Sequence, residues 1–154
     1  MRFKNTRVFY MISFIACTYF AYIFWLYLRP VEIISVHQEE NYISVLVKNF
    51  PFTDKGPINW WQSNKDMLKN RYNIPKPASY EGFTIIFWDY GDGYKEEGKY
   101  DRLCYSDVKP PKNCIDKNML LYITYTKSSG ISFIPHNDEY QINTKGELVK
   151  DESD

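Results

Sequence analysis

The sequence predicts an α+β protein in which a single N-terminal transmembrane helix is followed by a small exported domain, with one helix packed on an antiparallel meander sheet. Three observations predict this class. An uncharged apolar run lies near the start, one later stretch has apolar residues at helical spacing, and short β-branched or aromatic runs separated by turn residues follow. The expected boundaries are a cytoplasmic tail at 1–7, the transmembrane helix at 8–28 and the exported domain at 29–154.

The apolar run extends from Val8 to Leu28, which is 21 residues without a charge and matches the ~20 helical residues needed to cross a bilayer. Arg2, Lys4 and Arg7 precede the run. Positive charge flanking a membrane helix stays on the cytoplasmic side. We therefore expect a bacterial inner-membrane protein with a cytoplasmic N-terminus and a periplasmic domain.

Two other fates of this segment stay open. A cleaved signal peptide normally has an apolar region of ~7–15 residues and small residues at its cleavage site, and neither feature is present here. Lipidation at Cys17 is the second alternative, because Ile15 and Ala16 before it loosely match a lipoprotein signal. Cleavage there would leave an apolar stretch on the mature protein, so an uncleaved anchor is preferred.

The charge balance bears on the class of partner. The chain has 19 basic and 19 acidic side chains, which excludes the clustered positive charge typical of nucleic-acid-binding proteins. Residues 30–154 carry 15 basic and 19 acidic side chains, a net charge of −4. This acidic bias weakly favours a basic partner, although ordinary solubility is the preferred explanation.

Cys104 and Cys114 are the two cysteines outside the predicted anchor. An even pair in an oxidising compartment predicts a disulfide. A zinc site would need two more ligands at suitable spacing, and a redox pair would follow the C-x-x-C pattern. We expect a structural disulfide and neither a metal nor another cofactor.

The exported domain is predicted to start with a hairpin formed by Ile33–Val36 and Tyr42–Val47. A helix is expected next, with Thr53 as its cap and Pro57 in its first turn. At 100° per residue four apolar side chains fall within about a quarter of the helix circumference and form a core stripe. These are Ile58, Trp61, Leu68 and Tyr72. Asn73 and Pro75 are expected to end the helix.

The remaining strands are expected to form an antiparallel meander, because no further helical pattern separates them. They are Phe83–Trp88, Tyr100–Tyr105, Met119–Tyr125, Ile131–Ile134 and a last hairpin within 140–149. The linker 74–77 and the solvated tail 151–154 complete the chain.

No motif predicts catalysis. Asp89 and Asp92 do not follow a calcium-loop pattern, and their glycines predict a turn. His37 and His136 are expected at the surface or in turns, with no nucleophile motif beside either. An acid/base role for the two aspartates stays a minority alternative. We do not expect an enzyme or a small-molecule substrate.

Aromatic residues are the better candidates for binding. Trp60 lies with Met67 on the flank of the predicted helix stripe, where an exposed Trp beside Met would suit a protein interface. Packing in the core is the alternative for Trp60. The predicted partner-binding set is Trp60, Met67, Asp89, Tyr90, Asp92 and Tyr94.

Several stretches together resemble one known family. They include the segments Val47–Gly56, Ile58–Trp61, Phe87–Tyr94 and Asp101–Cys104, with Asn113–Ile115 after them. These segments resemble the enterobacterial putative membrane protein family, domain of unknown function 943. The resemblance implies a small membrane-anchored protein with this cysteine pair and no assigned activity. Some members of the family lie beside genes for secreted antibacterial toxins, which implies immunity proteins.

The expected function is therefore protein binding. We expect an immunity protein that neutralises a cognate toxin acting at the membrane or in the periplasm. The alternative is an envelope accessory protein that holds another membrane or secretion component.

Overall fold

The structure is a computed structural model that describes residues 2–76 and 82–151, with side chains described from Thr6 onward. The chain forms two compact units, residues 1–30 and 31–154. Pro77, at the end of the predicted linker, and residues 152–154 of the predicted tail lie outside the described residues.

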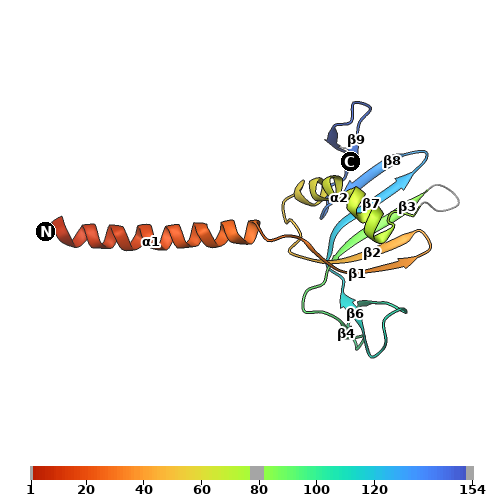
Figure 1. Cartoon of the computed structure of the whole chain (residues 1–154), viewed down its shortest axis with the longest axis horizontal. Helices are drawn as coiled ribbons and strands as arrows, with labels where there is room; N and C mark the ends of the chain where they lie inside the picture. Colours follow the sequence, from red (N-terminus) through yellow and green to blue (C-terminus); the bar gives the residue numbers. More distant parts are fainter. Residues whose placement is uncertain (1, 77–81, 152–154) are drawn as a thin grey trace. The chain divides into compact units, whose positions relative to one another are not determined.

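The first unit is dominated by helix α1 (Arg2–Tyr27), labelled in Figure 1. Its segment Thr6–Tyr27 is long and apolar enough to cross a membrane, and none of its apolar window is buried within the protein. The large side chains along it are exposed, from Val8 at 52% to Phe14 at 74%. A helix that is apolar on all sides requires either burial in protein or a lipid environment. The helix begins several residues earlier than predicted, within the basic segment.

The second unit contains one helix and ten strands (Figure 1). The helix is α2 (Gly56–Tyr72). The strands of the main sheet are β1 (Glu32–Glu39), β2 (Tyr42–Lys48), β3 (Phe83–Asp89), β7 (Met119–Thr126), β8 (Gly130–Ile134), β9 (Tyr140–Ile142) and β10 (Leu148–Lys150). A smaller sheet contains β4 (Lys95–Glu96), β5 (Arg102–Cys104) and β6 (Lys112–Asp116). The α+β class is thus confirmed.

The main sheet has the order β1-β2-β3-β7-β8-β9-β10. All of its neighbouring strands pair antiparallel except β2 and β3, which run parallel from Tyr42 opposite Thr84 to Val47 opposite Asp89. The prediction of a wholly antiparallel meander is therefore wrong at this pair. Parallel neighbours need a long crossover, and α2 lies within that connection. The helix returns the chain to the end of the sheet at which β2 begins, so that β3 runs in the same direction as β2.

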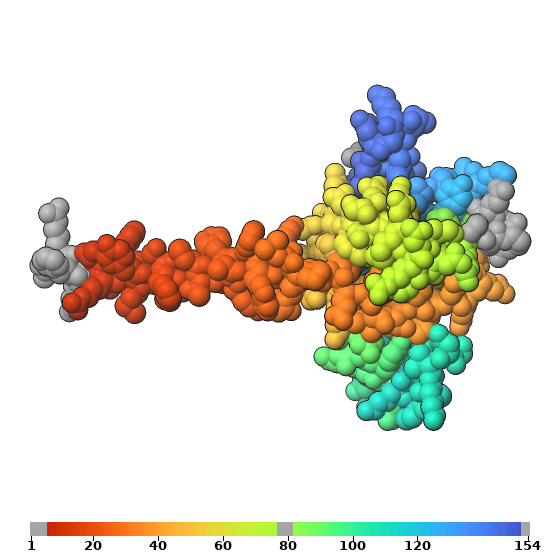
Figure 2. Space-filling model, in the orientation of Figure 1, coloured from red at the N-terminus to blue at the C-terminus, as the bar shows by residue number. Residues whose placement is uncertain are grey.

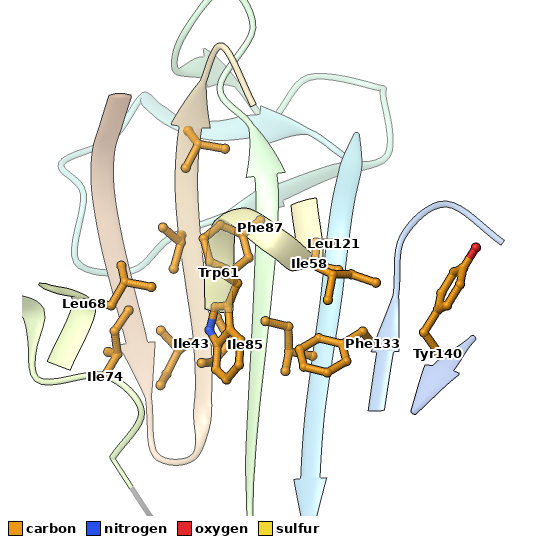
Figure 3. Packing of buried hydrophobic residues seen from close by; sticks show 13 residues of the cluster. Ile43, Ile58, Trp61, Leu68, Ile74, Ile85, Phe87, Leu121, Phe133 and Tyr140 are labelled. Atoms are coloured by element: carbon orange, nitrogen blue, oxygen red, sulfur yellow. The ribbon is translucent and has the colours of Figure 1, made fainter. Parts of the chain in front are cut away.

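Helix α2 covers one face of the main sheet. Ile58, Trp61 and Leu68 are buried as the helical spacing predicted, while Tyr72 is half-buried against the same core. The ring of Trp61 packs edge-on against Phe133 of β8, with 5.4 Å between centroids. Figure 3 shows Trp61 among the apolar side chains of the sheet.

The ends of α2 are set by local hydrogen bonds. Thr53 does not cap the helix: its Oγ1 accepts a bond from the Gly56 amide at 3.1 Å, while Lys55 occupies the cap position without a side-chain bond. The predicted cap is thus wrong by two residues, although Pro57 does lie in the first turn. Asn73 ends the helix in a left-handed conformation, and its amide donates to the Lys69 carbonyl.

The small sheet was not predicted. Tyr100–Tyr105 was expected in the meander, but β5 pairs with β6 in the separate small sheet, so that expectation is wrong. Cys104 and Cys114 face each other on β5 and β6 and form the predicted disulfide, with 3.9 Å between their Cα atoms. The segment that carries this sheet, green to cyan in Figure 2, forms a lobe beside the rest of the second unit.

Candidate binding site

The candidate site lies on the face of the main sheet opposite α2. Successive residues of a strand point to opposite faces. On β2, Val45 and Val47 therefore belong to the core under the helix, whereas Leu46 belongs to a second apolar cluster. In that second cluster Leu46 packs with Tyr105 and Ile115 from the small sheet and its loop. The small sheet thus covers part of the face that α2 leaves free.

His37 of β1 is the centre of a polar cluster at this junction. It is buried, with 5% of its surface exposed. Its Nδ1 lies 2.7 Å and 2.8 Å from the two carboxylate oxygens of Asp107. A carboxylate accepts, so Nδ1 carries the proton and donates, and in the neutral ring Nε2 accepts from the Tyr94 hydroxyl at 2.8 Å. The expectation of a surface histidine is therefore wrong at His37, although His136 does lie in an exposed turn.

Tyr105 stacks on the other side of this histidine. The rings of His37 and Tyr105 lie 3.8 Å apart between centroids with an angle of 17° between their planes. Burial raises the pKa of Tyr105 to about 12, and the nearby Asp107 and Glu39 carboxylates act in the same direction. The neighbouring Ser44 hydroxyl opposes this rise. Tyr105 therefore stays protonated at neutral pH.

The cluster holds hydroxyl groups and no ready nucleophile. Burial also raises the pKa of Tyr94, so neither phenol ionises near neutral pH. Both ring nitrogens of His37 are bonded within the protein. This arrangement fastens the loop after β5 to the main sheet.

A cavity of about 210 Å³ opens beside this cluster. Its walls come from β1, β2 and β3 of the main sheet and from the end of β5 with the residue that follows it. The lining residues are His37, Glu39, Tyr42, Ser44, Ile86, Trp88, Leu103, Cys104 and Tyr105. Drug-sized ligands occupy sites of ~300–1,000 Å³, so this cavity suits a smaller group.

Two buried polar groups on these residues lack partners. The Tyr105 hydroxyl and the Trp88 Nε1–H are shielded from solvent and make no hydrogen bond of standard geometry. The Ser44 hydroxyl is close enough to affect the pKa of Tyr105 without completing such a bond. A buried polar group without a partner costs about 1–3 kcal/mol.

The predicted binding residues fall into two separate sets. Trp60 and Met67 are half-buried and pack against the core under α2. The Trp60 ring lies edge-on to Phe50 and Phe87, with centroids 5.2 Å and 5.8 Å away. Tyr90 and Tyr94 pack instead in the second cluster, edge-on to each other at 5.4 Å. This packing therefore does not bring all six residues onto one continuous surface.

Asp89 and Asp92 hold the turn after β3. Asp89 accepts from the Gly91 amide at 3.1 Å and from the Asn118 side chain at 3.2 Å. The exposed Asp92 lies 3.7 Å from Lys95. Gly91 and Gly93 both have positive φ, which explains the glycines in this turn. No group of three or more His, Cys, Asp or Glu side chains converges on a metal position within the described part of the chain.

Sequence reasoning missed the contribution of Asp107 and Tyr105 and the burial of His37. Asp107 is 70 residues away from His37, so only the packing of the small sheet and its loop on the main sheet brings them together. One signal was available, since Tyr105 directly follows the cysteine that anchors β5.

Comparison with known proteins identifies one family. The family model described as "Enterobacterial putative membrane protein (DUF943)" matches residues 3–152, nearly the whole chain. No curated protein and no solved structure matches the chain.

Proposed function

Because the chain belongs to the enterobacterial membrane protein family DUF943, we propose that it is a membrane-anchored binding protein whose second unit holds a protein partner outside the cytoplasm. We further propose that the partner is an antibacterial toxin, which makes the chain an immunity protein. The observation that carries the binding role is the cavity beside His37, which is lined by aromatic side chains and by Glu39.

The charge pattern and the disulfide support the location. Basic residues precede the apolar helix, which favours a cytoplasmic N-terminus and a periplasmic second unit at the inner membrane. The Cys104–Cys114 bond belongs to an oxidising compartment such as the periplasm. An anchored domain meets any toxin at that membrane at a raised effective concentration, which favours capture. The toxin role itself rests on the family resemblance.

The cavity face supports binding better than catalysis. Tyr42 lies at the cavity and is 57% exposed, so a partner can reach it without unfolding the domain. The histidine beside it is already bonded on both nitrogens, and the two neighbouring phenols hold their protons. These features give a preformed recognition surface.

The proposal is tested by a mixed-culture competition. Strains that lack the gene are grown with toxin-producing kin and complemented with the wild type, Tyr42→Ala or Tyr100→Ala. Tyr100 is a matched control, because it is 62% exposed and does not line the cavity. We expect rescue by the wild type and by Tyr100→Ala, and a large loss of rescue with Tyr42→Ala at equal protein level.

Two results would contradict the proposal. Equal survival of the deleted strain while the toxin is verifiably produced would exclude the immunity role. Full rescue by Tyr42→Ala would exclude the cavity face as the binding surface.

An envelope accessory role is the second candidate, favoured by the many exposed aromatic side chains along α1 that could contact a membrane partner. Replacing residues 8–27 with an unrelated apolar helix, with Arg2, Lys4 and Arg7 kept in place, distinguishes the two. An immunity protein acting through its second unit keeps its protection, whereas a protein that recognises a membrane partner through α1 loses its function.

A further inference from the structure

We infer that the cavity beside His37 receives a positively charged side chain, arginine or lysine, from the protein partner. This inference rests on the proposed binding function and deepens it. It follows from the aromatic composition of the cavity wall, from its charge and from its size.

The wall is aromatic on several sides. Tyr42, Trp88 and Tyr105 contribute rings from β2, from β3 and from the residue after β5. The faces of aromatic rings carry partial negative charge and attract cations within ~6 Å. A guanidinium group also stacks on such rings through its flat surface.

The charge around the cavity is negative. Glu39 lines it, and Asp107 lies behind it on His37. No Lys or Arg is among the nine lining residues that the structure describes. The carboxylates of both Glu39 and Asp107 are close enough to Tyr105 to disfavour its ionisation. Their negative charge therefore acts on the part of the cavity wall that Tyr105 forms. A cation entering the cavity would therefore meet a carboxylate and no basic side chain among these lining residues.

The size and the polar groups of the wall fit one extended side chain. A volume of about 210 Å³ is below that of sites for whole small-molecule ligands. The Ser44 hydroxyl lines the cavity and has lone pairs that accept an N–H bond. A cationic group can donate to it while the Glu39 carboxylate of the same wall balances its charge. The second unit also has a net charge of −4 over residues 30–154, which favours a basic partner.

The test is a titration of the full-length protein in neutral detergent micelles, followed by NMR of the tryptophan indole N–H groups. The Trp88 signal is assigned from its loss in Trp88→Phe. The probes are the N-acetyl methylamides of arginine and lysine, with citrulline as the neutral analogue of arginine. We expect a saturable shift of the Trp88 signal with the cationic probes, and at least several-fold weaker binding of citrulline.

Two neighbouring glutamates give the matched control. Glu39 lines the cavity, whereas Glu40 lies in the exposed turn between β1 and β2. We expect Glu39→Gln to weaken arginine binding by about fivefold, as loss of a partly exposed ion pair does. Glu40→Gln makes the same change in net charge and is expected to leave binding unchanged.

The outcomes separate this inference from the proposed function. Equal shifts with arginine and citrulline, or none with either cation, would overturn the inference. Equal weakening by Glu39→Gln and Glu40→Gln would also overturn the inference, because binding would then follow the net charge and not the cavity. If Tyr42→Ala still abolished protection, the proposed function would stand although the inference of a cationic side chain had failed.

Discussion

Tyr105 is the residue whose environment most constrains its chemistry. It is 5% exposed, stacked on His37 and close to two carboxylates. An ionised phenolate would lose its hydration there and meet like charge. The side chain therefore acts as a neutral donor or acceptor in the cavity wall.

The raised pKa of Tyr105 predicts a loss of stability in alkali. In the unfolded chain the phenol loses its proton near pH 10, whereas in the folded protein it keeps it to about pH 12. The folded state thus binds more protons across this window, so the free energy of unfolding falls as pH rises from 10 to 12. We expect a contribution of at most about 2–3 kcal/mol, which Tyr105→Phe removes.

The measurement is thermal unfolding followed by circular dichroism at several pH values, with the wild type compared with Tyr105→Phe. Tyr100→Phe is the control, because Tyr100 is exposed and far less constrained. Parallel pH profiles for all three proteins would contradict the assigned burial of Tyr105.

At the scale of elements, α2 and the small sheet stabilise opposite faces of the main sheet. The helix contributes Ile58, Trp61 and Leu68 to one core, and the small sheet contributes Tyr105 and Ile115 to the other. Each element can therefore be perturbed separately.

Trp60 tests the helix side. Its ring contacts Phe50 and Phe87 and is half-buried, so Trp60→Ala leaves a gap beside the core. We expect a loss of about 2 kcal/mol in the free energy of unfolding, less than the ~3–5 kcal/mol of a fully buried ring. Trp60→Phe keeps part of the contact and should lose less. Unchanged stability together with lost protection would instead make Trp60 a binding anchor, as its place on the helix flank first indicated.

The disulfide tests the small-sheet side. Cys104 and Cys114 are ten residues apart, so losing their bond frees a short loop in the unfolded chain. Replacing both with serine is expected to cost about 2–3 kcal/mol and to loosen Tyr105, which follows Cys104. Chemical denaturation measures the loss, and Cys17→Ser is the control because Cys17 is outside the pair. Equal stability of all three proteins would show that the bond contributes little.

At the scale of the whole molecule, the proposed orientation in the membrane is testable directly. A C-terminal alkaline phosphatase fusion should be active, because that enzyme needs an oxidising compartment, and a matching green fluorescent protein fusion should stay dark. Replacing Arg2, Lys4 and Arg7 with glutamate should reduce the phosphatase activity, since the proposed topology depends on these positive charges. An inactive phosphatase fusion with a fluorescent partner would reverse the proposed topology.

Local chemistry in the sequence was sufficient for several features. The apolar run, the helical stripe of α2, the α+β class and the cysteine pair all follow from nearby residues, whose spacing and composition carry the signal. Each of these features depends on residues within one element or, for the disulfide, on the pairing of the two cysteines outside the apolar run.

Only the tertiary structure decided the parallel pairing of β2 with β3, because that pairing depends on where α2 returns the chain. It also decided the candidate site. His37, Asp107 and Tyr105 come from β1 and from the segment after β5, and nothing local marks them as neighbours. The helical spacing showed that Trp60 lies on the flank of the helix stripe. The packing of Trp60 against Phe87 depends on the sheet beneath the helix. Strand order and the packing of one sheet on another bring such residues together, and neither has a signature in a single stretch of sequence.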